Sequence, residues 1–328
     1  MSAKYLKQIV FLWIASGVGF ATLTHAQNTS KELAEKVPIA DVHRHVQRWI
    51  SPEQLKQQMQ EQNIGWSGAV GAPFGPWDTA PYAQLLGKKY IATAGQVELS
   101  GIYAQHGASG LTDINLDTYK SLLQRSEKLF ADGRIKGFGE LILNNQTSNP
   151  MVSFRRKVDI DSAPIEAMFK IAAKHKGFVQ IHSEDDADSV DQLKTLATKY
   201  PDVAIILSHC LLTGNSELVK TLLTQHQNLY CEMSARSKSH YPNVDNERIR
   251  TRVIYGEDFA KAEWLKLIDA LPTRFMVGTD TFTPERWYYV VEHAQWSRQW
   301  LADLPRDDYR FAPFPGQDWE DVPFSVSG

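Results

Sequence analysis

From residue 116 onward, the chain alternates between short apolar runs and longer amphipathic segments. The apolar runs lack the every-second-residue alternation of a half-exposed strand, which predicts strands buried on both faces. These predicted strands are 135–143, 178–181, 203–207, 228–233 and 274–277. The amphipathic segments repeat apolar residues at helical spacing. They predict helices at 117–132, 163–175, 186–200, 217–226, 261–271 and 284–301.

The first part of the chain has a less regular pattern. A short apolar run predicts a strand at 37–42, and a serine N-cap with a proline in the first turn predicts a helix at 52–62. Residues 65–81 are rich in Gly, Pro and Trp, which predicts a substrate-side loop with a short strand at 68–72. Residues 80–102 predict a helix followed by a strand.

Strands and helices that alternate with short connections are typical of a parallel sheet covered by helices on both faces. About eight strand–helix units fit into the chain, which predicts a (β/α)8 barrel of the TIM type. A doubly wound open sheet is the alternative. No glycine-rich turn follows the first predicted strand, which disfavours the nucleotide-binding form of that alternative. We therefore expect an α/β protein built as a (β/α)8 barrel.

The two ends of the chain differ from the barrel in composition. Lys4 and Lys7 precede an apolar run that is short for a membrane span, and small residues near Ala26 offer a cleavage point. We expect a cleaved secretory signal peptide and a periplasmic or secreted protein that is not inserted in the membrane, with an uncleaved anchor as the alternative. The expected segments are a signal peptide at 1–26, a polar leader at 27–36, the barrel at 37–304 and an irregular tail at 305–328.

Charge and cysteine content narrow the classes of function. The formal net charge over 328 residues is −3 and no long run of basic residues is present, so nucleic acid and anionic membranes are not expected as partners. The expected partner is a small-molecule substrate, and a homo-oligomer stays open. The chain has two cysteines, Cys210 and Cys231, which permit either one disulfide in an exported protein or two buried free thiols.

Residue types that bind metals follow the predicted strands repeatedly. His43 and His45 follow the first strand, and positions i and i+2 of an extended chain point to the same side, so the two imidazoles can share one ion. Such residues recur at later strand ends: Glu140, His182, His209 and Asp280. In a parallel barrel all these ends open on one rim. The pattern predicts a site for one or two divalent metal ions with these six residues as ligands.

Four pieces of the sequence carry a resemblance to a known family: Ala40-Asp41-Val42-His43-Arg44-His45, Gln180-Ile181-His182-Ser183, Leu207-Ser208-His209-Cys210 and Val277-Gly278-Thr279-Asp280. From about residue 37 to 304, the chain resembles the amidohydrolase-related branch of the metal-dependent amidohydrolase superfamily. The resemblance implies a (β/α)8 barrel, zinc or a similar ion, and hydrolysis of an amide, lactone or ester. It also implies that Asp280 deprotonates the hydrolytic water and returns the proton to the leaving group.

The residue on the fourth barrel strand bears on the number of metal ions. Many superfamily members have a carboxylated lysine there that bridges two metals, whereas this chain has Glu140. In some members, including TatD-like nucleases, a glutamate bridges two ions instead. The resemblance therefore allows two ions, and the alternative is a carboxylate that contacts substrate or supports a single ion.

Several weaker candidates and alternative functions stay open. Arg236, just beyond the seventh strand, is a candidate for binding a substrate carboxylate, and Trp77 is a candidate for lining the pocket. The acidic run after His182, residues 184–186, reads as a solvated helix start. A decarboxylase of the same superfamily and a non-catalytic, metal-loaded periplasmic binding protein are the alternative functions. A phosphoesterase would require a basic rim, which this acidic chain does not predict.

Overall fold

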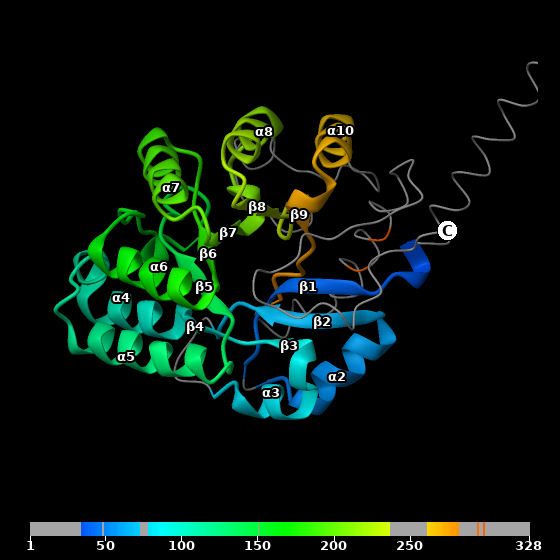
Figure 1. Cartoon of the computed structure of the whole chain (residues 1–328), viewed down its shortest axis with the longest axis horizontal. Coiled ribbons are helices and arrows are strands. Elements are labelled where there is room, and N and C mark those ends of the chain that lie inside the picture. The colour runs from blue at the N-terminus through cyan, green and yellow to red at the C-terminus, as the bar shows by residue number, and fades with distance from the viewer. Residues whose placement is uncertain are drawn as a thin grey trace, which may run out of the picture.

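The structure is a computed structural model in which residues 34–47, 49–72, 78–149, 151–236 and 261–281, with 294 and 298, are described (Figure 1). The strands are β1 (Ile39–Arg44), β2 (Ile64–Ala69), β3 (Tyr90–Ile91), β4 (Thr93–Gly95), β5 (Gly137–Ile142), β6 (Phe178–His182), β7 (Ala204–Leu207), β8 (Leu229–Glu232) and β9 (Phe275–Met276). Every neighbouring pair is parallel. Within these residues, no helix is both long enough and apolar enough to cross a membrane.

The strands form a closed ring. One sheet has the order β1-β2-β3 and the other the order β4 to β9. Only Ala92 separates β3 from β4, so a single stretch of chain pairs first with β2 and then with β5. At the other side, the backbone N–H of Val42 donates to the carbonyl of Val277 at 3.0 Å, and the bridges Asp41–Val277 and Arg44–Thr281 are parallel. With β3 and β4 as one strand, the ring has eight strands, which confirms the predicted barrel.

Helices cover the outside of the ring, as Figure 1 shows. They are α2 (Pro52–Glu61), α3 (Ala80–Leu86), α4 (Gln96–Gly110), α5 (Asp117–Ala131), α6 (Ala163–His175), α7 (Ala187–Lys199), α8 (Ser216–Gln225) and α10 (Ala262–Ala270). Short 3-10 turns are η1 (Gly87–Lys89), η2 (Val152–Phe154), η3 (Ser208–Cys210) and η5 (Pro272–Arg274). Each longer helix buries one stripe, for example Met168 and Phe169 on α6. Ser51 caps the start of α2, as the sequence predicts, and forms a capping box with Gln54.

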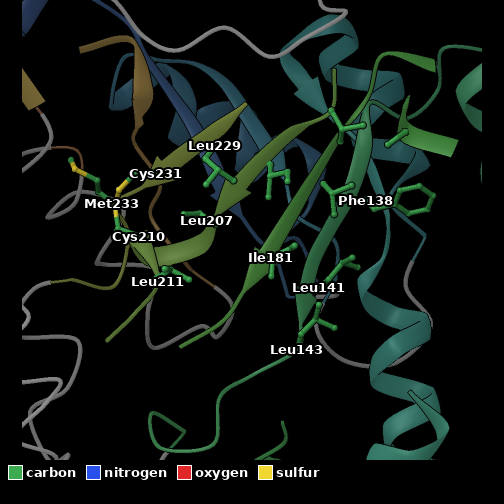
Figure 2. Close-up of a cluster of buried hydrophobic side chains, with 14 of the residues drawn as sticks. Phe138, Leu141, Leu143, Ile181, Leu207, Cys210, Leu211, Leu229, Cys231 and Met233 are labelled. Atoms are coloured by element: carbon green, nitrogen blue, oxygen red, sulfur yellow. A yellow bond between two sulfur atoms is a disulfide. The ribbon is translucent and has the colours of Figure 1, made fainter. Parts of the chain in front are cut away.

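Alternate residues of the strands enter two separate clusters. On β7, Ile205 and Leu207 pack with the helix layer, whereas Ala204 and Ile206 join a smaller cluster. The smaller cluster draws on successive strands and fills the inside of the ring: Ala40, Val42, Ala69, Ile91, Phe178, Ala204, Ile206 and Met276. Figure 2 shows Ile181, Leu207 and Leu229 of the larger cluster on neighbouring strands.

The main error in the predicted elements concerns the second strand. It was expected at 68–72 but lies at Ile64–Ala69, because Gly68 (φ 129°) and Ala69 (φ 64°) leave the extended conformation and end it. The region 80–102 holds a helix and then a strand, as predicted, and α4 begins inside its last residues. The signal peptide, the tail and most of the last predicted helix lie outside the described residues; Ala294 and Arg298 are helical.

Candidate metal centre

His43 and His45 are buried at the end of β1 and are oriented through their Nδ1 atoms. His43 Nδ1 lies 2.8 Å from Glu232 Oε2, and His45 Nδ1 lies 2.9 Å from the carbonyl oxygen of Gly71. Because both partners only accept hydrogen bonds, each Nδ1 carries a proton, and in the neutral imidazole the lone pair then stays on Nε2. The two Nε2 atoms face the same carboxylate oxygen, Asp280 Oδ1, each at 3.5 Å.

Asp280 follows β9 and is fixed by the neighbouring first strand. Its backbone N–H donates to the carbonyl of His43 at 2.8 Å. The residue before it, Thr279, donates from its backbone N–H and its hydroxyl to the buried carboxylate of Asp41, at 3.0 and 2.9 Å. Asp280 itself has a φ of 49°, a left-handed conformation that non-glycine residues rarely adopt. The pairing of β1 with the end of β9 thus brings Asp280 to the two histidines.

Glu140, on β5, lies between all four histidines. Its Oε1 is 2.9 Å from His182 Nδ1, 3.4 Å from His209 Nε2 and 3.6 Å from His43 Nε2. Its other oxygen, Oε2, is 3.8 Å from His45 Nε2. One carboxylate therefore lies beside both ligand groups: both of its oxygens face the His43–His45–Asp280 group, and Oε1 also faces the His182–His209 group.

His182 and His209 complete the second group, with ring centroids 4.9 Å apart. His209 Nδ1 lies 2.9 Å from the hydroxyl of Ser234, which leaves Nε2 directed at Glu140. The backbone of His209 is left-handed, with a φ of 56°. The six predicted ligand residues, separated by up to 237 positions in the sequence, are therefore close together in the structure.

The spacing of these atoms fits a metal ion. Four ligands about 2.1 Å from a tetrahedral ion lie about 3.4 Å from one another. The separations that join Asp280 and Glu140 to the Nε2 atoms of His43, His45 and His209 are 3.4–3.8 Å. Such distances exceed a hydrogen bond. His43 Nε2 is buried without a hydrogen-bond partner in the described part of the chain, as is His182 Nε2. The residues present therefore fit a divalent cation.

Electrostatics also favours a cation among these groups. Burial raises the pKa of Glu140, but the neighbouring charges of His43 and His182 outweigh burial and hold that pKa well below its usual value. Burial lowers the pKa of His43, yet Glu140 and Glu232 raise it well above the usual value. Glu140 and Glu232 thus draw positive charge to this position, and without a metal a second proton on His43 supplies it. A bound metal would supply that charge instead and leave His43 neutral, with its Nε2 lone pair available.

The structure places the two weaker candidates differently. Arg236 is buried, and its guanidinium donates to four backbone carbonyls of the loop after β7, on His209, Leu211, Leu212 and Gly214. These bonds support that loop, so a contact with substrate gains no support from its position. Trp77 lies outside the described residues.

The acidic run after His182 was expected to be a solvated helix start, and this expectation was wrong for its first residue, Glu184. Glu184 is buried and accepts hydrogen bonds from the backbone of Thr147 and of Ser148, at 2.8 and 2.7 Å. Asp186 caps α7 by accepting from the N–H of Ser189. Glu184 therefore fixes the loop after β5, and in the part of the chain that the structure describes its hydrogen bonds do not include a histidine of the site.

Sequence reasoning missed Glu232, the last residue of β8. Its side chain is fully buried and contacts His43 directly. A charged residue at the end of the apolar run 228–233 is the signal that could have revealed it. The structure also pairs Cys210 with Cys231 in a disulfide, visible in Figure 2, one residue from His209 and one from Glu232.

No family model matches the sequence, and no curated protein matches it. Among solved structures, the chain is similar to an amidohydrolase from Burkholderia multivorans with bound zinc (14% identity, TM-score 0.42, 76% of this chain and 80% of that one). It is also similar to dihydroorotase from Campylobacter jejuni (14%, 0.42, 80% and 80%) and to a probable 2-pyrone-4,6-dicarboxylic acid hydrolase from Acinetobacter baumannii (12%, 0.40, 80% and 96%). Likeness at this level carries no inference about activity, and the barrel assignment stands on the strand pairing described above.

Proposed function

We propose that this protein is a metal-dependent hydrolase that cleaves a C–N or C–O bond, in an amide, lactone or ester, of a small molecule. The observation that carries the proposal is the convergence of His43 Nε2, His45 Nε2 and the Glu140 carboxylate on Asp280 at coordination spacing. A divalent ion held there would lower the pKa of a water molecule and polarise the substrate carbonyl.

Asp280 is the residue that we assign to proton transfer. Its Oδ1 lies beside both Nε2 atoms, so it is next to any water activated there. The hydrogen bonds that fix Thr279 to Asp41 and Asp280 to His43 hold its carboxylate in one orientation. Backbone held in a sparsely populated conformation is concentrated at functional sites. In this role Asp280 accepts the proton of the water and then donates it to the leaving group.

We further propose that zinc is the metal and that two ions share Glu140. The donors are imidazoles and carboxylates, which zinc prefers. Glu140 Oε2 faces His45, whereas Oε1 faces His182 and His209 and also lies 3.6 Å from His43 Nε2. A carboxylate whose oxygens lie beside two groups of ligands could bridge two ions.

Replacing Asp280 by Asn tests the assignment. The asparagine preserves the shape and one donor oxygen, so Asp280→Asn should retain metal while kcat falls by about 10²–10⁴. Turnover is measured on a panel of esters, lactones and amides with zinc-loaded wild type as the reference. His45→Ala is the matched variant that should lose metal and activity together. Full activity in Asp280→Asn would contradict the assignment, and no turnover of the panel by metal-loaded wild type would favour a binding protein.

Export to the periplasm or the medium is proposed as well. It is supported by the signal-like residues 1–26 and by the disulfide between Cys210 and Cys231, because disulfides persist in oxidising compartments. Cell fractionation and N-terminal sequencing test it. An exported chain that starts near Gln27 is expected, and full-length protein in the cytoplasm would contradict the proposal.

A further inference from the structure

Glu232 is a buried carboxylate whose described ionic partners are two histidines of the candidate metal centre. Its Oε2 lies 2.8 Å from His43 Nδ1 and 3.8 Å from His209 Nδ1. The side chain has no exposed surface. A buried charge is costly unless hydrogen bonds and opposite charge compensate it. The position of Glu232 therefore indicates a specific task at the histidines.

The contact with His43 selects one tautomer of that imidazole. Gln180 Nε2 lies 3.2 Å from the same Nδ1 and, as a donor, would favour an unprotonated Nδ1. The carboxylate of Glu232 is closer, at 2.8 Å, and can only accept a hydrogen bond. It therefore keeps the proton on Nδ1 and leaves the lone pair on Nε2, the atom that faces Glu140 and Asp280.

A second chain of hydrogen bonds joins Glu232 to His209. The Ser234 hydroxyl donates to Glu232 Oε2 at 2.9 Å and can accept from His209 Nδ1, also at 2.9 Å. The backbone N–H of His209 donates to Glu232 as well, at 3.2 Å. One carboxylate on β8 is thus hydrogen-bonded to a histidine of each ligand group, directly to His43 and through Ser234 to His209.

Gly278 gives Glu232 the space to reach His43. A Cβ atom at this glycine would lie 2.3 Å from Glu232 Oε1 and 2.5 Å from His43 Cβ. Both contacts, one to an oxygen and one to a carbon, are shorter than 3.0 Å, which real Cβ atoms essentially never show. Gly278, two residues before Asp280, therefore allows the Glu232 carboxylate and the His43 imidazole to come into contact.

We propose that Glu232 is a positioning residue that fixes the tautomer and orientation of His43 and, through Ser234, of His209, and thereby sets the metal affinity of the centre. The inference rests on the proposed metal-dependent function. Carboxylates that accept the outer N–H of a metal-bound imidazole typically contribute 10–100-fold to metal affinity.

Zinc affinity of the chelator-stripped full chain tests the proposal, measured by competition with a chromogenic chelator. Glu232→Gln should weaken binding of zinc by about 10–100-fold. Ser234→Ala should weaken only the zinc binding that depends on His209. Glu232→Asp keeps the charge but shortens the side chain, and it should not restore wild-type zinc affinity. Glu184→Gln is the matched control, because Glu184 is also a buried carboxylate at the barrel rim but contacts Thr147 and Ser148 in place of a histidine. It should leave zinc affinity unchanged.

Nitrogen NMR of the histidine rings provides a second measurement that a purely structural role would not change. In zinc-loaded wild type, His43 should show a proton on Nδ1, and Glu232→Gln should lose that strongly hydrogen-bonded signal. A folded Glu232→Gln or Glu232→Asp chain that binds zinc as tightly as wild type would overturn the inference. If Glu232→Gln does not fold, Ser234→Ala and Glu232→Asp decide it by the same affinity criterion. Failure of wild type itself to bind zinc would instead reject the proposed function.

Discussion

Reduction of the Cys210–Cys231 disulfide should destabilise the protein by an amount that follows from the length of the loop it closes. The two cysteines are 21 positions apart and join η3 to β8. In the chain-entropy model, closing a loop of this length removes about 11 cal/mol/K from the unfolded chain, or about 3 kcal/mol at 25 °C. The folded protein keeps the same side-chain atoms after reduction, so this loop term should dominate the change.

Urea unfolding of oxidised and reduced wild type measures the change, with a chelator in both samples so that metal binding does not contribute. With an m-value of about 3 kcal/mol/M, the loss of about 3 kcal/mol moves the midpoint down by about 1 M. Titration of thiols in denaturant should rise from none to about two per chain, as the two cysteines require. A Cys210→Ala/Cys231→Ala variant should not respond to the reductant. An unchanged midpoint in a fully reduced sample would refute the reasoning.

Two further predictions concern residues away from the metal ligands. Arg236→Ala should lower the free energy of unfolding by about 3–5 kcal/mol, because four backbone carbonyls lose their donor. Urea unfolding measures this loss, and KM for an active substrate should stay unchanged. A raised KM with unaltered stability would instead support the substrate-binding role. Hydrogen bonds from Lys199, Lys170 and Tyr200 lower the pKa of Glu166 to about 2. The contribution of the Glu166 carboxylate to stability should be present above its unfolded pKa of about 4.3 and be lost as pH falls through about 2. Its size should be below about 1 kcal/mol, because water screens the ion pairs of Glu166. The difference in stability between wild type and Glu166→Gln, measured from about pH 2 to 6, should shrink toward acid, and a constant difference would contradict this assignment.

The barrel could be predicted because its parallel strands are buried on both faces. Runs such as 203–207 are apolar throughout, and the polar residue that ends each run marks the rim. The second strand was misplaced because Gly65 and Gly68 interrupt its apolar pattern, and the sequence does not show that it pairs with β1 through Ile64 and Trp66. Its position is set by neighbours, which a local pattern does not contain.

The clustering of the six candidate ligands could be predicted because each stands at a strand end, but the residues that support them could not. Glu232 and His43 are 189 positions apart and meet only because the ring closes between β1 and β9. The pairing of Cys210 with Cys231 likewise depends on the register of β7 and β8, in which Leu207 lies opposite Cys231. The contacts of Arg236 could not be predicted because a strand-end arginine can bind a substrate or backbone carbonyls, and only the folded loop positions those carbonyls.

Zinc titration of the stripped chain tests the central claim most directly. Wild type should bind about two zinc ions per chain, since its ligands form two groups that share Glu140. Glu140→Ala should bind about one at most, because both groups lose an oxygen. Wild type that binds no zinc would contradict the metal centre itself, and one ion in both proteins would contradict the bridging role of Glu140.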